Sequence, residues 1–580
     1  MKTLYSKSTF HIVMLVSLLM SLIGGAVFAI PARASFTPSN GQPAHLVLGQ
    51  ANFTSKTQGI SATAMSAPGG VAVDPTTGKM FVGDGMNFRI LRFASLALLR
   101  NGAAAEAVLC QPDFVSKTSS LTACDPNGLS IDSSGRLWVA DAASHRVLRF
   151  DNASSKSNGA SPDGVLGQPD FSTGTPGTTA SKLNLPIGVF ADSNGRLWVT
   201  DLSNNRVLRF DNAASKANGA AADGVLGQTN FTSAGSATKS TSMKNPFTAI
   251  LDSAGRLWVA DGYNCRVLRF DNAAAKANGA AADGVLGQTD FTTAGPSLSQ
   301  KNFSVVESVT VDNSTGTLYV SDDNNRVMVF NNAAGKANGA NADSVLGQPD
   351  FTSSNPLNLS AASLYAPRQV FFDSKEKVLW VADRFNSRIL MFGQIARTFQ
   401  STGIRDGWVL ESGENTNVGG TMDSASTTLR LGDDATHKQY RSVLSFNTSN
   451  LPDTAVITKV TLKVKRQGIT GGGNPVTEFQ GFMADIKKGT FGTSALQITD
   501  FQALGKIYGP FSLSGTWYVL DLTAAKAYVN KLSTLYGLTQ IRLRFKLGDN
   551  NNAIANYLSL YSGNAPVASR PQLVIEYYVP

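Results

Sequence analysis

Residues 252–270 read DSAGRLWVADGYNCRVLRF, and this stretch decides the fold because it returns along the chain. Residues 132–150 read DSSGRLWVADAASHRVLRF, and residues 192–210 read DSNGRLWVTDLSNNRVLRF. The acid that closes the first half of the motif falls at Asp84, Asp141, Asp201, Asp261, Asp322 and Asp383, and the arginine that opens the second half at Arg89, Arg146, Arg206, Arg266, Arg326 and Arg388. This recurrence indicates six repeats of one structural unit.

Each unit has the pattern of four short strands separated by Gly, Asn and Asp turns. In the fourth unit we expect strands at 249–252, 257–260, 266–270 and 284–288. Such strands form an antiparallel meander, and one four-stranded meander cannot bury both of its faces alone. The copies must therefore stack in a ring, so the sequence predicts an all-β six-bladed β-propeller.

The count of fourth strands predicts how the ring closes. Segments similar to VLGQ end at Gln50, Gln111, Gln168, Gln228, Gln288 and Gln348. The first of them, in His45–Phe53, precedes every three-strand core, whereas the last core, Val370–Phe392, has no fourth strand after it. We expect His45–Phe53 to pair beside Arg388–Phe392, because this pairing hides two sheet edges.

The pattern GxLWVAD…NxRVLRF resembles the NHL repeat, and the resemblance covers residues 36–398. It implies a propeller, but not one function, because similar propellers bind proteins, peptides, RNA or sugars, and a few are lyases or lactonases. The recurrent Asp and Arg are interpreted as structural partners across a tight loop, against the alternative of a ring of ligand-binding charges. The variable loops Pro169–Asn184 and Thr229–Asn245 are where specificity would reside.

The N-terminal 34 residues have the order of a signal peptide. Lys2 and Lys7 precede the apolar run Ile12–Phe28, and Ala32-Arg33-Ala34 forms a small-residue cleavage site. We expect a secreted or cell-surface protein with no membrane span after cleavage, with an uncleaved anchor as the alternative. The formal net charge of +9 over 580 residues is only mildly basic, so no nucleic-acid partner is expected.

The few cysteines and histidines limit which catalytic and metal sites the chain could form. Cys110 and Cys124 are close in sequence, and export would allow a disulfide between them, leaving Cys265 unpaired. The chain has only four histidines, no CxxC pair and no G-x-S-x-G motif. The sequence therefore gives no catalytic residues and disfavours an enzyme.

Residues 405–580 follow a different β pattern. Strand-like runs occur at 439–446, 456–465, 517–522, 541–547 and 572–579, and residues 456–465 alternate between a buried and a wet face. They predict a β-sandwich of jelly-roll type. Thr427–Val464, with TTLRLGDD at its start, and Thr516–Thr523, TWYVLDLT, resemble DNRLRE-type jelly-roll modules related to carbohydrate-binding module family 96. The resemblance implies attachment to polysaccharide or envelope.

Two sets of residues are candidates for a site in this module. Aromatic faces that can stack on sugar rings are offered by Trp408, Tyr440, Trp517, Tyr557 and Tyr561, with core or rim packing as the alternative. Oxygen ligands for Ca²⁺, the one cofactor suggested, are offered by Asp433, Asp434 and Asp549, with solvated turn acids as the alternative.

We therefore expect a secreted binding or scaffold protein. Its propeller would engage a protein or glycan partner, and its C-terminal module would anchor it to polysaccharide or the cell envelope. Two alternatives stay open: a metal-dependent propeller enzyme of the lactonase or lyase type, whose ligands would come from separate blades, and a purely structural envelope protein.

Overall fold

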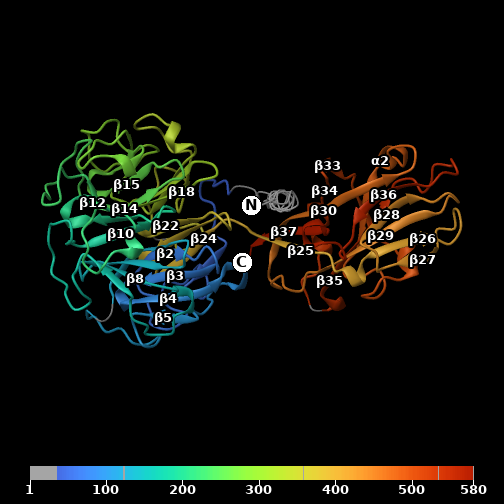
Figure 1. Cartoon of the computed structure of the whole chain (residues 1–580), viewed down its shortest axis with the longest axis horizontal. Helices are drawn as coiled ribbons and strands as arrows, with labels where there is room; N and C mark the ends of the chain where they lie inside the picture. The colour runs from blue at the N-terminus through green and yellow to red at the C-terminus, as the bar shows by residue number, and fades with distance from the viewer. Residues whose placement is uncertain (1–35, 122–123, 357, 533, 579–580) are drawn as a thin grey trace, which may run out of the picture.

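A computed structural model describes residues 36–121, 124–356, 358–532 and 534–578. These residues form six four-stranded antiparallel sheets and one 13-stranded sheet, in two lobes (Figure 1). The predicted fold class is confirmed: the protein is nearly all β, with a six-bladed propeller followed by a large curled sheet. The signal-peptide prediction falls on residues 1–34, outside the described part. No helix among the described residues is long and apolar enough to cross a membrane.

The six blades contain the strands that the repeats predict. Within each blade, the first strand lies nearest the axis and the fourth lies at the outer edge. Blades 1 to 3 are formed by β2 (Pro68–Val73), β3 (Lys79–Asp84), β4 (Arg89–Ser95), β5 (Ala107–Leu109); β6 (Pro126–Ile131), β7 (Leu137–Asp141), β8 (Arg146–Phe150), β9 (Gly164–Leu166); and β10 (Pro186–Ala191), β11 (Leu197–Asp201), β12 (Arg206–Phe210), β13 (Gly224–Leu226). Blades 4 to 6 are formed by β14 (Pro246–Leu251), β15 (Leu257–Asp261), β16 (Arg266–Phe270), β17 (Gly284–Leu286); β18 (Val306–Asp312), β19 (Thr317–Asp322), β20 (Arg326–Phe330), β21 (Ser344–Leu346); and β22 (Pro367–Asp373), β23 (Val378–Asp383), β24 (Arg388–Phe392), β1 (Leu46–Leu48).

The ring closes as the strand count predicts. Strand β1 pairs antiparallel with β24, so that Leu46 lies opposite Met391 and Leu48 opposite Ile389. The N-terminal segment thus completes blade 6, whose own chain continues into the C-terminal lobe instead of supplying a fourth strand.

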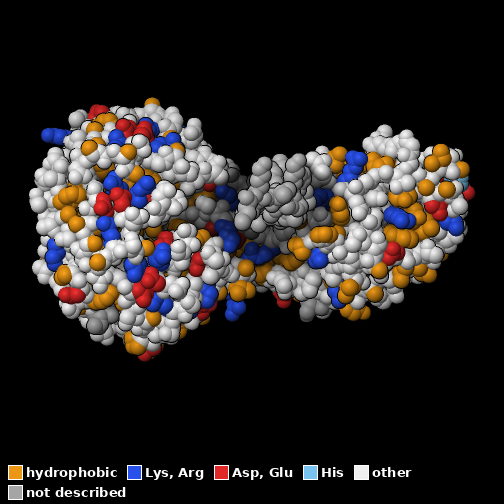
Figure 2. Space-filling view, viewed as in Figure 1, with side chains coloured by type: hydrophobic (Ala, Val, Ile, Leu, Met, Phe, Trp, Pro, Cys, Tyr) orange, Lys and Arg blue, Asp and Glu red, His pale blue; other side chains and the backbone are white. Residues whose placement is uncertain are grey.

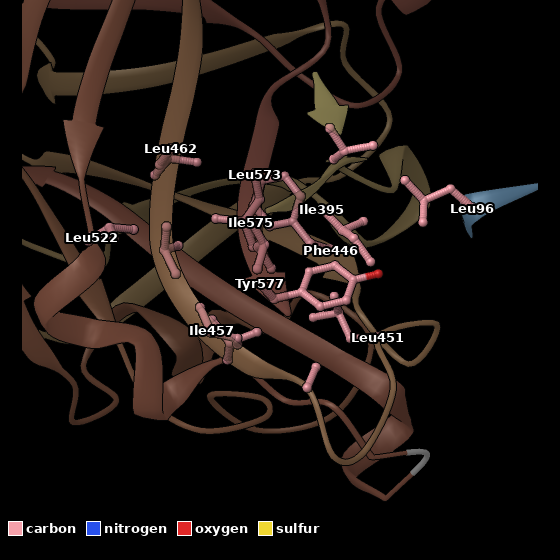
Figure 3. Packing of buried hydrophobic residues seen from close by; sticks show 14 of the residues in the cluster. Leu96, Ile395, Phe446, Leu451, Ile457, Leu462, Leu522, Leu573, Ile575 and Tyr577 are labelled. Carbon is pink, nitrogen blue, oxygen red and sulfur yellow. The ribbon is translucent and has the colours of Figure 1, made fainter. Parts of the chain in front are cut away.

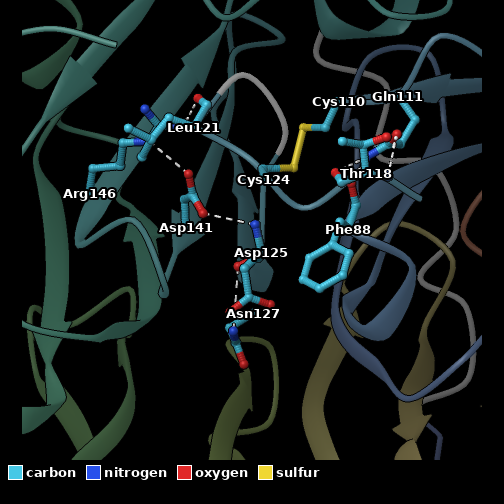
Figure 4. Close-up of a disulfide and its surroundings, with 10 residues drawn as sticks. All are labelled: Phe88, Cys110, Gln111, Thr118, Leu121, Cys124, Asp125, Asn127, Asp141 and Arg146. Atoms are coloured by element: carbon cyan, nitrogen blue, oxygen red, sulfur yellow. Dashed lines mark hydrogen bonds and ion pairs between the residues drawn. A yellow bond between two sulfur atoms is a disulfide. The ribbon is translucent and has the colours of Figure 1, made fainter. Parts of the chain in front are cut away.

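The repeated polar residues are structural. The side chains of Asp201 and Arg206 are fully buried, and Arg206 Nε donates to Asp201 Oδ2 at 2.7 Å. The same arginine donates to the carbonyls of Thr179 and Lys182 in one loop and of Phe231 in the next. Each pair therefore joins a blade to the two long loops beside it. Figure 4 shows the equivalent pair, Asp141 and Arg146.

Asn-Gly dipeptides protect the outer edge of every blade. Asn218 Oδ1 accepts the Val165 N–H of the preceding blade at 3.0 Å, and the Gly219 N–H donates to the Val165 carbonyl. The same asparagine bond is made by Asn40, Asn101, Asn158, Asn278 and Asn338. The exposed edge strand of each sheet is thereby covered, which removes a template for pairing with other chains. The N-terminal segment therefore supplies blade 6 with two parts: the fourth strand, and the Asn-Gly turn at Asn40 that covers the edge of blade 5.

Cys110 and Cys124 form a disulfide, with their Cα atoms 5.7 Å apart (Figure 4). This is the pairing suggested by the sequence. Cys265 is a free, buried thiol.

The sixth unit departs from the repeat at its first turn, where Glu376 and Lys377 replace the usual residues. Lys377 takes a left-handed conformation with φ of 56°, and its N–H donates to the Asp373 carbonyl. Gly78 and Gly316 have φ values of 71° and 70° in the turns of blades 1 and 5. Lys377 thus occupies the left-handed position that glycine holds in the turns of blades 1 and 5.

The C-terminal sheet curls around its own core. Its strands are β25 (Ile395–Gln400), β26 (Gly407–Glu411), β27 (Gly419–Asp423), β28 (Thr428–Asp433), β29 (Gln439–Asn447), β30 (Val456–Thr470), β31 (Phe482–Ile486), β32 (Lys506–Tyr508), β33 (Ser512–Ser514), β34 (Trp517–Asp521), β35 (Leu538–Phe545), β36 (Asn556–Tyr561) and β37 (Gln572–Tyr578), with one short helix, α2 (Pro475–Glu478). Strand β30 buries Val460, Leu462 and Val464, but a bulge between Ile457 and Lys459 reverses the alternation at its start.

The two lobes share one hydrophobic cluster. Leu96 of blade 1 and Ile395 belong to it together with Tyr577 of β37 (Figure 3). The sequence places the end of the propeller at residue 398, whereas β25 pairs with β37 and so belongs to the C-terminal sheet. Only Gly393 and Gln394 separate β24 from β25.

Candidate functional site

All five predicted aromatic residues lie on strands whose outer faces adjoin. Trp408 is on β26, Tyr440 on β29, Tyr557 and Tyr561 on β36, and Trp517 on β34. In β36 the two tyrosines alternate with the fully buried Leu558 and Leu560, which fixes them on the side away from the core.

The first cluster surrounds one guanidinium group. Arg430 of β28 lies 5.3 Å from the Trp408 ring centroid, 5.6 Å from that of Tyr440 and 5.2 Å from that of Tyr557. Tyr440 meets both other rings edge to face. Because Tyr440 is only 6% exposed, it supports the cluster from below, whereas Trp408 and Tyr557 are half-buried and offer surface.

The second cluster joins two lysines to two rings. Lys463 Nζ lies 5.2 Å from the Trp517 ring centroid, and Lys465 Nζ lies 5.9 Å from Trp517 and 5.6 Å from Tyr561. Burial lowers the pKa of Lys463. The two lysines hold their stems along the rings, a placement in which the cation attracts the electron-rich ring face.

Strand β36 connects the clusters into one surface, which we call the aromatic-basic stripe: Trp408, Arg430, Tyr440, Lys463, Lys465, Trp517, Tyr557 and Tyr561. Tyr557 and Tyr561 are four residues apart on one strand, a distance of about 13 Å. Between them lies Ser559, and across from Tyr561 is Thr428, whose hydroxyl donates to Gln467. Figure 2 shows basic and hydrophobic side chains side by side on the part of the C-terminal lobe over β28 and β36.

The stripe combines what recognition of an anionic sugar needs. The half-buried rings of Trp408, Tyr557, Trp517 and Tyr561 offer flat apolar surface, and the three cations attract negative groups. The sequence missed Arg430, Lys463 and Lys465. The alternation of 456–465 already put both lysines on the wet face, and the same alternation in TLRLG marks Arg430.

The three acids considered for Ca²⁺ are engaged with the protein itself. Asp433 accepts the backbone N–H groups of Asn550 and Asn556, and Asp434 accepts those of Thr436 and Lys438. Asp549 accepts the Asn551 N–H and lies 3.4 Å from His437 Nδ1. Among the described residues no group of three or more His, Cys, Asp or Glu could hold a metal ion.

The propeller axis holds a cavity of about 520 Å³. Apolar side chains from all six inner strands line it: Val73, Ile131, Phe190, Ile250, Val311 and Phe371. Gln369 lines its inner end, where the side-chain oxygen accepts the N–H groups of Val71 and Leu129 from two other blades. This amide therefore links blade 6 to blades 1 and 2 beside the cavity.

Comparison with known proteins agrees with the repeat pattern. The NHL repeat model matches residues 124–150 and 183–210, which lie in blades 2 and 3. The propeller contains NHL repeats. A search of curated proteins found no match.

Among solved structures, the chain is similar to hydrazine synthase of Kuenenia stuttgartiensis, with 12% identity and a TM-score of 0.34 over 57% of this chain and 78% of that one. It is also similar to a streptogramin B lyase, with 13% identity and a TM-score of 0.34 over 57% of this chain and 95% of that one.

Proposed function

We propose that this is an exported binding protein whose C-terminal domain attaches to an acidic polysaccharide through the aromatic-basic stripe. The observation that carries the proposal is the convergence of five aromatic residues with Arg430, Lys463 and Lys465 on one outer face. The resemblance of Thr427–Val464 to carbohydrate-binding modules and the N-terminal export pattern support it. The Cys110–Cys124 disulfide fits an oxidising compartment.

The three cations beside the aromatic rings favour an anionic over a neutral glycan. A neutral chain would need only the ring faces, and the three cations would then remain solvated beside it. A chain of uronic acids or sulfated sugars would pair with them, and that attraction weakens as salt rises, because exposed charges are screened over about 10 Å at 0.1 M.

Cosedimentation of the full chain with insoluble polysaccharides tests the proposal. We expect retention on cross-linked polyuronate, less on cellulose, and a loss of at least fivefold in affinity between 50 and 300 mM salt. Trp517→Ala and Arg430→Gln should each reduce retention, whereas Tyr536→Ala, which removes an exposed aromatic outside the stripe, should not. Equal retention of all three variants, or no retention on any acidic glycan, would refute the assignment.

A further inference from the structure

Charged residues break the six-fold symmetry of the propeller at the axial mouth opposite the cavity. The second residue of the inner strand is Gly69, Asn127, Ile187 and Phe247 in blades 1 to 4, but Glu307 in blade 5 and Arg368 in blade 6. The first residue after the repeated aspartate is Gly85, Ala142, Leu202 and Gly262 in blades 1 to 4, but Asp323 and Arg384 in blades 5 and 6. Two acids of blade 5 thus adjoin two arginines of blade 6.

This arrangement is not needed to build a blade. Four blades fold with uncharged residues at the same positions, and placing an ion pair in a nearly buried position costs desolvation energy. Arg368 Nη1 donates to Glu307 Oε2 at 2.8 Å, and these side chains are 15% and 9% exposed. Arg368 Nε is buried and makes no hydrogen bond to any described residue.

The second arginine and the second acid remain available. In the part of the chain that the structure describes, no carboxylate lies within 4.0 Å of the guanidinium of Arg384, and Asp323 is exposed at the mouth without an ion-pair partner. Burial lowers the pKa of Arg384 and the nearby charge of Arg368 lowers it further, whereas the charges of Glu307, Asp323 and Asp125 raise it. An anion that reaches Arg384 would give its guanidinium the close, charge-assisted partner that no described carboxylate supplies within 4.0 Å.

Aromatic rings lie beside the two arginines. Arg368 lies over the Phe247 ring at 5.5 Å, and Tyr263, half exposed, meets Phe247 edge to face. Arg384 lies over the exposed Phe385 ring at 5.0 Å. The mouth therefore offers a cationic group, an anionic group and apolar ring surface in one place.

We propose that this mouth, formed by Glu307, Asp323, Arg368 and Arg384, binds a small zwitterion that carries an apolar side group. The ligand's carboxylate pairs with Arg384, its ammonium pairs with Asp323, and its side group contacts Tyr263 or Phe385. Glu307 positions Arg368. The site is independent of the stripe, since it lies in the propeller.

Titration calorimetry of the full chain with three probes tests the charge pattern. L-phenylalanine carries both charges, 3-phenylpropanoate only the carboxylate, and 2-phenylethylamine only the ammonium. We expect L-phenylalanine to bind at least tenfold more tightly than either analogue. Arg384→Gln should weaken L-phenylalanine and 3-phenylpropanoate at least tenfold and leave 2-phenylethylamine unchanged, and Asp323→Asn should do the reverse.

Lys375→Gln is the matched control, because Lys375 is a charged residue at the opposite end of the axis, beside the cavity. It should change the affinity of no probe. Equal affinities for the three probes would show that charge does not select the ligand and would overturn the proposal. Absence of binding by all three at millimolar concentration would also overturn it, and would make the cluster a latch between blades 5 and 6.

Discussion

Replacing Asn278 by alanine should expose the edge of blade 3 without disturbing the rest of the ring. Asn278 Oδ1 accepts the Val225 N–H at 3.0 Å, and Val225, in the outermost strand β13, is 2% exposed. The substitution leaves this buried donor without a partner, which costs about 1–3 kcal/mol. If the cost falls on local opening of β13, amide exchange at Val225 should accelerate by about 5- to 150-fold, since 1.4 kcal/mol is tenfold.

Hydrogen exchange followed by mass spectrometry measures this on the peptide that contains β13. Asn278→Asp keeps a side-chain acceptor and should restore most of the protection. The peptide containing β17 is an internal control, because Asn338 covers Val285 in the same way. Unchanged exchange at β13 in Asn278→Ala would refute the reasoning, since it would mean that the Gly279 N–H and the pairing with β12 protect the edge alone.

Three further predictions concern stability. Arg206→Leu should lower the free energy of unfolding by about 3–5 kcal/mol, measured by urea denaturation, because it leaves Asp201 charged and buried. Replacing Cys110 and Cys124 by serine should cost about 3 kcal/mol through the lost loop constraint, visible as a lower Tm that reducing agent no longer changes. Burial raises the pKa of Asp406 to about 7, so the folded state keeps a proton that the unfolded chain releases. The stability of the C-terminal domain should therefore fall as pH rises from about 4 to about 7, and Asp406→Asn should flatten that dependence in pH-resolved denaturation.

The features that could be predicted from the sequence are those that follow from a repeated motif or from the alternation of polar and apolar residues. The motif at 252–270 identified the blades, and the position of His45–Phe53 identified the strand that closes the ring. The role of the Asn-Gly dipeptides was not predicted, because Asn218 acts on Val165 of another blade, 53 residues away. Residues 212–220 and 272–280 are nearly identical, which indicates a repeated structural connector but not the strand that the connector covers.

The charged cluster at the mouth of the propeller could not be predicted from the sequence for a related reason. Glu307 and Arg368 are 61 residues apart and belong to no common motif. They stand out only when equivalent positions of six blades are compared, and that comparison requires the register of the inner strands, which the structure supplies. The bulge in β30 could not be predicted for the same reason. Alternation predicts which residues of a strand are buried, and nothing in the sequence marks the extra residue that reverses the alternation.

The connection between the lobes places the C-terminal domain at the closure of the ring. Strand β24 pairs with β1 and continues after Gly393 and Gln394 into the C-terminal sheet, while His45, just before β1, donates from Nδ1 to the Gly393 carbonyl and stacks on Tyr578 at 4.9 Å. Under the proposed attachment to polysaccharide, a force on the C-terminal domain would reach blade 6 first. In that blade, the strand supplied by the N-terminal segment is the one element not covalently continuous with the rest. Blade 6 also carries Arg368 and Arg384. The bonds made by Asn40, His45 and Phe53 keep that segment in the ring, so they protect the blade that provides both arginines of the proposed site.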